Sequence, residues 1–149
     1  MYKHILVPTD GSPLSMKAVK TATKLAQTIN AKITALHVLH PYAPPIMEDA
    51  VLAYSGAYSP KEYKKTSEAR ARKVLDEVKE SIEKSNVECA TEFVADDQPW
   101  NAIVNAAKGK KCDLIVMASH GRRGLAGVLI GSETTKVLTH SKTPVLVCR

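Results

Sequence analysis

The chain contains the segment Leu114-Ile115-Val116-Met117-Ala118-Ser119-His120-Gly121, in which a short apolar run passes directly into a glycine-containing loop. A continuous apolar run of this length is typical of a strand buried on both faces, as in a parallel sheet. Further along, Gly131-Ser132-Glu133-Thr134-Thr135 opens a helix. The order of strand, glycine loop and helix is typical of an α/β protein.

The same segment has the chemistry of an anion site. Glycine lets the backbone approach a ligand closely, and a helix N-terminus presents unpaired N–H groups and the positive end of its dipole. Hydroxyl groups on Ser132 and Thr134 add donors, and Arg122 and Arg123 add positive charge. From this local pattern alone, phosphate binding and a plain strand-to-helix turn beside two solvated arginines fit equally well.

The bulk composition predicts a single domain over residues 1–149. With 149 residues, 44% of them hydrophobic and 24% charged, the chain can bury a core of its own. No apolar run approaches the roughly 20 residues of a membrane span, and Pro8 and Asp10 come too early for a secretory signal. The three cysteines have no paired or metal-like spacing, which favours free thiols. We therefore expect a cytoplasmic protein with no membrane partner.

The charge balance favours anions in general. The formal net charge is +6 and the sequence pI is about 9.2. However, the lysines of the helical segments are mixed with acids or lie opposite the apolar stripe. One Phe and one Trp provide no interleaving of aromatic and basic residues for base stacking. We therefore expect a solvated surface and no nucleic-acid partner.

Apolar runs and amphipathic stripes alternate along the whole chain. Helices are expected to begin at Ser12-Pro13, Ser59-Pro60 and Asp97-Gln98-Pro99, and a proline-rich loop is expected at residues 40–59. This alternation predicts an α/β fold, a single five-stranded parallel sheet with helices on both faces. The expected strands are residues 2–8, 32–39, 87–94, 113–117 and 145–147, and the last helix is residues 132–139.

The loops after the strands are where a ligand is expected. In open α/β sheets, ligands bind beyond the carboxyl ends of the strands. Asp10 follows the first strand and could accept a hydrogen bond from a ribose hydroxyl or an adenine amino group, or form an Asx turn before the helix. If the first and fourth strands are neighbours, Asp10 and Gly121 face one crevice.

The motifs of other nucleotide-binding folds, of receiver domains and of common active sites are weak or missing in this sequence. The chain has no P-loop string, and no G-x-G-x-x-G follows the first strand. A phosphoacceptor receiver domain needs an acidic pair after the first strand, where only Asp10 is present, so it is a weak alternative. The histidines lack zinc-like spacing and Ser119 has no evident base, so no dedicated active site is expected. His120 could touch a phosphate or orient the turn.

With these residues the chain resembles the universal stress proteins, specifically the branch that binds ATP. That branch is marked by glycine, two residues, glycine, nine residues, glycine and then serine or threonine; here nine residues separate Gly121 and Gly131, and Ser132 follows. The opening Ile5-Leu6-Val7-Pro8-Thr9-Asp10-Gly11-Ser12 and the closing Thr143-Pro144-Val145-Leu146-Val147 also look like that family. Ala118 replaces the first glycine of the motif, and because alanine resists positive φ we expect binding that persists but is weakened.

The resemblance implies an adenine nucleotide alpha-hydrolase-like fold with strand order 3-2-1-4-5. It further implies a homodimer that pairs the strands at residues 145–147, and a stress-response sensor or regulatory module that binds ATP, ADP or AMP with Mg²⁺. Two alternatives are a nucleotide-free dimer that acts through protein contacts and a slow ATPase, although no residue evidently positions an attacking water. The nucleotide-binding residues are expected to be Pro8, Thr9, Asp10, Val38, Met117, Ala118, Ser119, His120, Gly121, Arg123, Gly124, Gly131, Ser132, Glu133 and Thr134.

Overall fold

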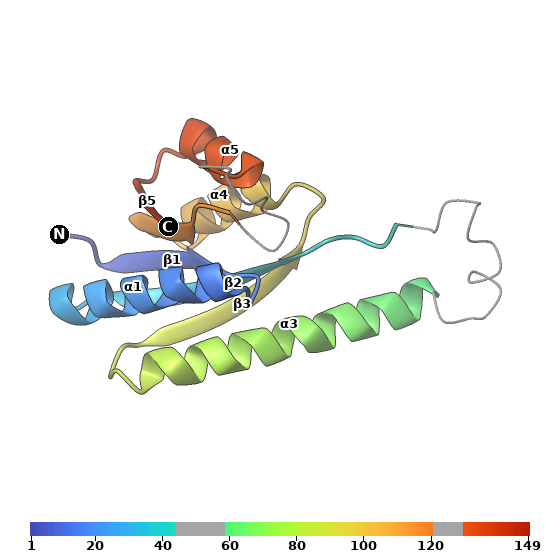
Figure 1. The fold of residues 1–149 in the computed structure, drawn as a ribbon, viewed down its shortest axis with the longest axis horizontal. Helices are drawn as coiled ribbons and strands as arrows, with labels where there is room; N and C mark the ends of the chain where they lie inside the picture. Colours follow the sequence, from blue (N-terminus) through green and yellow to red (C-terminus); the bar gives the residue numbers. More distant parts are fainter. Residues whose placement is uncertain (44–58, 121–129) are drawn as a thin grey trace.

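A computed structural model of the chain describes residues 1–43, 59–120 and 130–149. In it, five parallel strands form one sheet in the order β3-β2-β1-β4-β5 (Figure 1). The α/β class and the strand order expected from the sequence are therefore confirmed. The strands are β1 (His4–Pro8), β2 (Lys32–Leu39), β3 (Cys89–Ala95), β4 (Leu114–Ala118) and β5 (Val145–Cys148), and the helices are α1 (Pro13–Ile29), α3 (Pro60–Glu83), α4 (Pro99–Gly109) and α5 (Ser132–His140).

Helices α1 and α3 begin at the predicted caps. The Ser12 hydroxyl accepts a hydrogen bond from the backbone N–H of Ser15 at 3.2 Å, and a proline occupies the first turn of the helix. Ser59 caps α3 in the same way through the N–H of Glu62, at 3.1 Å. At its other end α1 stops at Asn30, whose φ of 54° lies in the left-handed region.

Three predicted strands begin one or two residues later than expected, and the first of them, expected at residues 2–8, begins at His4. The strand expected at residues 87–94 begins later, at Cys89, because the chain first turns through Asn86 with a φ of 55°. The strand expected at 113–117 begins at Leu114, and just ahead of it the carboxylate of Asp113 accepts the backbone N–H groups of Lys3 and His4 at 2.8 and 2.9 Å. This carboxylate ties the chain ahead of β1 to the chain ahead of β4.

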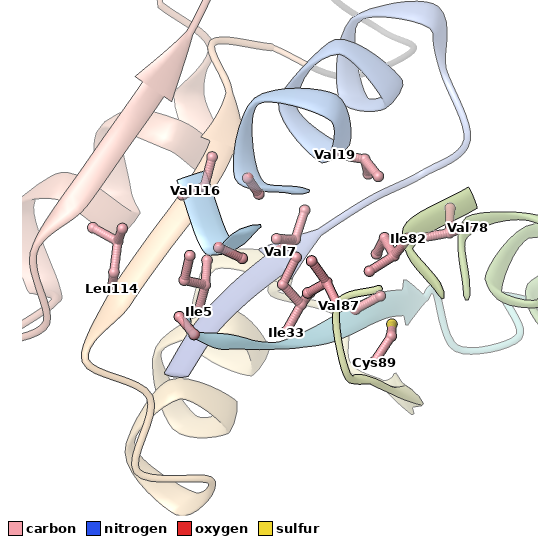
Figure 2. Packing of buried hydrophobic residues seen from close by; sticks show 14 of the residues in the cluster. Ile5, Val7, Val19, Ile33, Val78, Ile82, Val87, Cys89, Leu114 and Val116 are labelled. Carbon is pink, nitrogen blue, oxygen red and sulfur yellow. The ribbon is translucent and has the colours of Figure 1, made fainter. Parts of the chain in front are cut away.

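The sheet is buried on both faces, which explains why its central strands are continuously apolar. Side chains of a strand alternate between the two faces, so Ile5 and Val7 of β1 point to one and Leu6 to the other. Helices α1 and α3 cover the first face, and α4 and α5 cover the second (Figure 1). Figure 2 shows the first cluster, in which β-strand residues meet Val19 of α1 and Val78 of α3.

The cysteines are free thiols, as their spacing predicts. Cys89 and Cys112 are buried, and burial raises the pKa of each thiol to about 11. Cys148, on β5, is only partly buried. In the described ranges, no helix combines the length and the apolar character needed to cross a membrane.

Candidate functional site

The loop after β1 begins between the ends of the two neighbouring strands, β2 and β4, as the predicted crevice requires. β1 pairs with β2 on one side and with β4 on the other. The backbone N–H of Thr9, just past β1, donates to the carbonyl of Leu36 at 2.8 Å. On the other side, the N–H of Ser119, just past β4, donates to the carbonyl of Cys148 at 2.7 Å. The first residue of each loop is therefore fixed to a neighbouring strand.

The loop after β1 is held by short polar contacts. Thr9 is buried, its Oγ1 lies 3.0 Å from Ser15 Oγ, and the same oxygen accepts the N–H of Gly11 at 3.2 Å. Gly11 has a φ of 75°, which favours glycine. Asp10 Oδ1 accepts the N–H of Ser12 at 2.9 Å, which is the Asx turn considered from the sequence. This turn points the chain from β1 into α1.

The backbone N–H and C=O groups of Val38 are directed toward the loop after β1. In a strand, the N–H and C=O groups of alternate residues point to the same neighbouring strand. Leu36 pairs with β1 and accepts from Thr9, whereas the carbonyl of Leu39 accepts the N–H of Asp96 on the β3 side at 3.0 Å. The backbone groups of Val38 therefore point toward the space beyond Pro8, where β1 has ended.

Gly131, the residue that caps α5, lies directly against the loop after β4. Its N–H donates to the carbonyl of Ser119 at 2.7 Å. A Cβ added to Gly131 would lie 3.2 Å from that same oxygen and 3.2 Å from the Cβ of His120. Its φ is −72°, so glycine is needed here for close approach and not for a left-handed conformation. Ser119 and His120 are therefore packed closely against the start of α5.

The first turn of α5 has the features of an anion-binding helix end. Gly131, at the N-cap position, has no side chain that could cap the helix. The N–H groups of Ser132, Glu133 and Thr134 begin the helix, where the backbone has no partner within the helix. Ser132 is exposed. Together with the positive end of the helix dipole, this turn can bind a phosphate or carboxylate.

The side chains of Thr134 and Glu133 each form a hydrogen bond to another element of the fold. Thr134 is 2% exposed, and its hydroxyl donates to the carbonyl of Ala118 at 3.0 Å. The hydroxyl that the pattern assigned to a phosphate therefore anchors α5 to β4, and only the backbone N–H is left for a ligand. Glu133 Oε2 accepts the N–H of Trp100 in α4 at 2.9 Å. Sequence reasoning missed this contact, although Gln98, a poor cap ahead of Pro99, was a signal that α4 needs a partner.

Ala118 does not adopt the positive φ that would disfavour alanine. Ala118 is the last residue of β4, and the non-glycine residues with positive φ in the described ranges are Asn30, Asn86 and Lys111. Alanine therefore fits this position without strain. The neighbouring site residues are Met117, which is buried, Ser119, which is 2% exposed, and His120, whose Nδ1 lies 3.2 Å from Ser119 Oγ. Gly121, Arg122, Arg123 and Gly124 lie outside the described residues.

Two hollows on the surface lie elsewhere. One, of about 420 Å³, is lined by residues such as Lys3 and Asn86 near the amino ends of the strands. The other, of about 440 Å³, is lined by β3 and α4 residues such as Val94 and Asn105. The candidate site thus rests on backbone geometry at the carboxyl ends. Among the residues that the structure describes, no group of three or more His, Cys, Asp or Glu side chains could hold a metal ion.

Comparison with known proteins covers the full chain. The model of the Universal stress protein family matches residues 1–149. Universal stress protein MJ0531 from Methanocaldococcus jannaschii is 33% identical over 152 residues, which cover 100% of this chain and 83% of that protein.

Solved structures agree with this match. The structure of the hypothetical protein MJ0577, a universal stress protein from Methanocaldococcus jannaschii, has a TM-score of 0.81 and 28% identity, and covers 99% of this chain and 96% of that chain. A universal stress protein in complex with cAMP has a TM-score of 0.71 and 28% identity, and covers 99% of this chain and 97% of that chain. These proteins share the fold described above.

Proposed function

This chain belongs to the universal stress protein family, and from that membership we propose that it binds an adenine nucleotide between the loops after β1, β2 and β4. A nucleotide complex exists within the family, since one similar structure contains cAMP. The observation that carries the proposal is the packing of Gly131 against Ser119, where a Cβ would lie 3.2 Å from a backbone oxygen. This packing holds the N-terminus of α5 beside the end of β4, where a phosphate could accept hydrogen bonds from the helix N–H groups.

The phosphates are proposed to lie at the start of α5. The N–H groups of its first turn and the exposed Ser132 hydroxyl provide donors. The sequence motif adds Gly121, Arg123 and Gly124, which are outside the described residues. The described residues offer no cluster of carboxylates for a metal ion. Mg²⁺ would therefore enter with the nucleotide, since phosphate and water oxygens are ligands that suit it.

The adenosine is proposed to lie between Val38 and the loop after β1. The backbone of Val38 offers one donor and one acceptor on the open side of β2, which suits the polar edge of adenine. The carboxylate of Asp10 is the proposed acceptor for a ribose hydroxyl. Pro8 and Thr9 at the end of β1 and Met117 at the end of β4 form the inner wall. Each of these residues is within or next to a strand end.

We infer that the protein works as a cytoplasmic sensor or regulatory module in a homodimer. Three free thiols suit a reducing compartment. β5 is an edge strand, and its Leu146 side chain is 40% exposed. An open apolar edge favours aggregation unless it is paired, and pairing with the same strand of a second copy removes that liability. The bound nucleotide would then be read by a protein partner.

Two glycine variants test the site. Gly131→Val puts a branched side chain against Ser119 and His120, whereas a Cβ at Gly109, the last residue of α4, meets nothing within 4 Å. We expect Gly131→Val to weaken binding of a fluorescent ATP analogue by more than about tenfold, and Gly109→Val to leave it unchanged. Circular dichroism and the melting temperature (Tm) check that both variants fold. Unchanged affinity in a folded Gly131→Val protein would refute the proposed site.

A further inference from the structure

The side chain of Glu133 joins the first turns of two helices. Its Oε2 accepts a hydrogen bond from the backbone N–H of Trp100 at 2.9 Å, and its Oε1 accepts one from Lys136 Nζ at 3.1 Å. Trp100 is the second residue of α4, and Glu133 is the second residue of α5. The two helices lie side by side on one face of the sheet (Figure 1). A carboxylate of α5 therefore caps α4.

Helix α4 needs this contact because its own N-terminus has no side-chain cap. Gln98 makes no cap hydrogen bond, and Pro99 has no N–H to donate. The N–H of Trp100 is therefore the first backbone donor of the helix. A carboxylate at this point also meets the positive end of the α4 dipole, which stabilises the negative charge. Breaking the contact leaves the first turn of α4 uncapped and the first turn of α5 without its tie to α4.

The same contact fixes where the negative charge of Glu133 lies. This residue belongs to the turn whose N–H groups are proposed to bind phosphate, and a carboxylate turned toward a phosphate would repel it. Instead, the carboxylate is directed to α4 by Trp100, and Lys136 partly balances its charge. The turn can thus carry an acidic residue and still bind an anion.

We propose that Glu133 is a positioning residue for nucleotide binding, and this inference rests on the proposed function. Its carboxylate holds the phosphate-facing turn of α5 against α4 and passes a change at that turn to Trp100. The chain contains one tryptophan, and the Trp100 ring centroid lies 4.6 Å from that of His140, the last residue of α5. Tryptophan emission therefore reports on the contact between the two helices.

Three variants distinguish a positioning role of Glu133 from a general effect on the stability of the protein. Glu133→Ala removes the cap, Glu133→Gln keeps an oxygen that can accept the N–H of Trp100, and Ser59→Ala removes the unrelated cap of α3. Affinity is measured with a fluorescent ATP analogue, and tryptophan emission is measured at saturating ATP. We expect Glu133→Ala to weaken affinity about five- to tenfold and to abolish the emission change caused by ATP. Glu133→Gln should stay within about twofold of the parent protein, and Ser59→Ala should lower the Tm but not the affinity.

The outcomes distinguish this inference from the proposed function. If the parent protein binds ATP and Glu133→Ala binds it equally well, the positioning role is refuted and the proposed function stands. Equal losses of affinity in Glu133→Ala and Ser59→Ala, or no recovery in Glu133→Gln, also refute the positioning role. If the parent protein binds none of ATP, ADP and AMP, the proposed function fails and this inference fails with it.

Discussion

The hydroxyl of Thr134 donates a hydrogen bond to the carbonyl of Ala118 at 3.0 Å, and so joins the first turn of α5 to the last residue of β4. The two residues are 16 positions apart in the sequence, and the residues between them contain the loop that the motif assigns to phosphate. Ala118 is also where the motif has a glycine. One buried hydrogen bond therefore holds both ends of this loop.

Replacing Thr134 with valine should lower stability. The two side chains have similar shapes, but the variant leaves the buried carbonyl of Ala118 without its partner, at a cost of about 1–3 kcal/mol. Urea denaturation gives the free energy of unfolding. Thr139→Val is the matched control, because the Thr139 hydroxyl donates to a carbonyl within α5 on an exposed face. Equal losses in the two variants would contradict the structural role of Thr134.

Acid should destabilise the protein partly through His4. Burial, followed by the nearby charge of Lys32, lowers the pKa of His4 below its ordinary value of about 6.5, and His4 Nε2 lies 2.8 Å from Thr34 Oγ1. The unfolded chain binds the proton of His4 more tightly than the folded chain does. The contribution of neutral His4 to stability is therefore present above about pH 6.5 and is lost as the pH falls below it. His4→Gln should reduce the pH dependence of the unfolding free energy below about pH 6.5. An unchanged dependence would contradict this assignment.

The contribution of Asp113 to stability should be lost at a lower pH than that of His4. Burial alone would raise the pKa of the Asp113 carboxyl. Hydrogen bonds from the N–H groups of His4 and then Lys3 outweigh burial and lower this pKa below its ordinary value. Its contribution is present above that ordinary value, about 3.9, and is lost as the pH falls through the lowered pKa. Asp113→Asn should therefore destabilise the protein near neutral pH and flatten the acid limb of its unfolding curve. Titration of both proteins by circular dichroism checks this, and superimposable acid limbs would count against it.

The three thiols should differ in reactivity. Burial raises the pKa of Cys89 and Cys112 to about 11, so little thiolate forms near neutral pH, and both side chains are covered. Cys148 lies partly exposed on β5. A thiol-specific reagent should therefore label Cys148 first in the native protein and the other two only after unfolding, as peptide mass spectrometry can show. Rapid native labelling of Cys89 or Cys112 would contradict the described core.

The proposed dimer can be tested on its edge strand. Leu146→Glu puts a charge on the exposed side of β5, which should disfavour pairing with a second copy. Ala90→Glu makes the same change at an exposed position of β3, the opposite edge of the sheet. Light scattering after gel filtration should find a monomer for Leu146→Glu and a dimer for the parent protein and Ala90→Glu. A dimer that survives Leu146→Glu, or a monomeric parent protein, would argue against pairing through β5.

The fold could be predicted from the sequence because its signals are local. Apolar runs such as Ile5-Leu6-Val7 mark strands that are buried on both faces, and the caps Ser12 and Ser59 act within three residues of their partners. The dipeptide Gly131-Ser132 likewise identified the turn that opens α5.

Parts of the site could not be predicted because they depend on tertiary contacts. The bond between Glu133 and Trp100 joins residues 33 positions apart, and it exists only because α4 and α5 lie next to each other. The engagement of the Thr134 hydroxyl has the same origin. The concern over backbone strain at Ala118 arose from a motif that specifies a residue type but no backbone angle, and Ala118 lies in a strand without a positive φ.

We propose above that the N-terminal turn of α5 and the loop after β1 form an adenine nucleotide site. Calorimetric titration of the parent protein with ATP, in the presence and absence of Mg²⁺, tests it most directly. We expect saturable binding of one nucleotide per chain, which is strongly weakened in Gly131→Val and retained in Gly109→Val. The absence of saturable binding of ATP, ADP and AMP to the folded parent protein would contradict it.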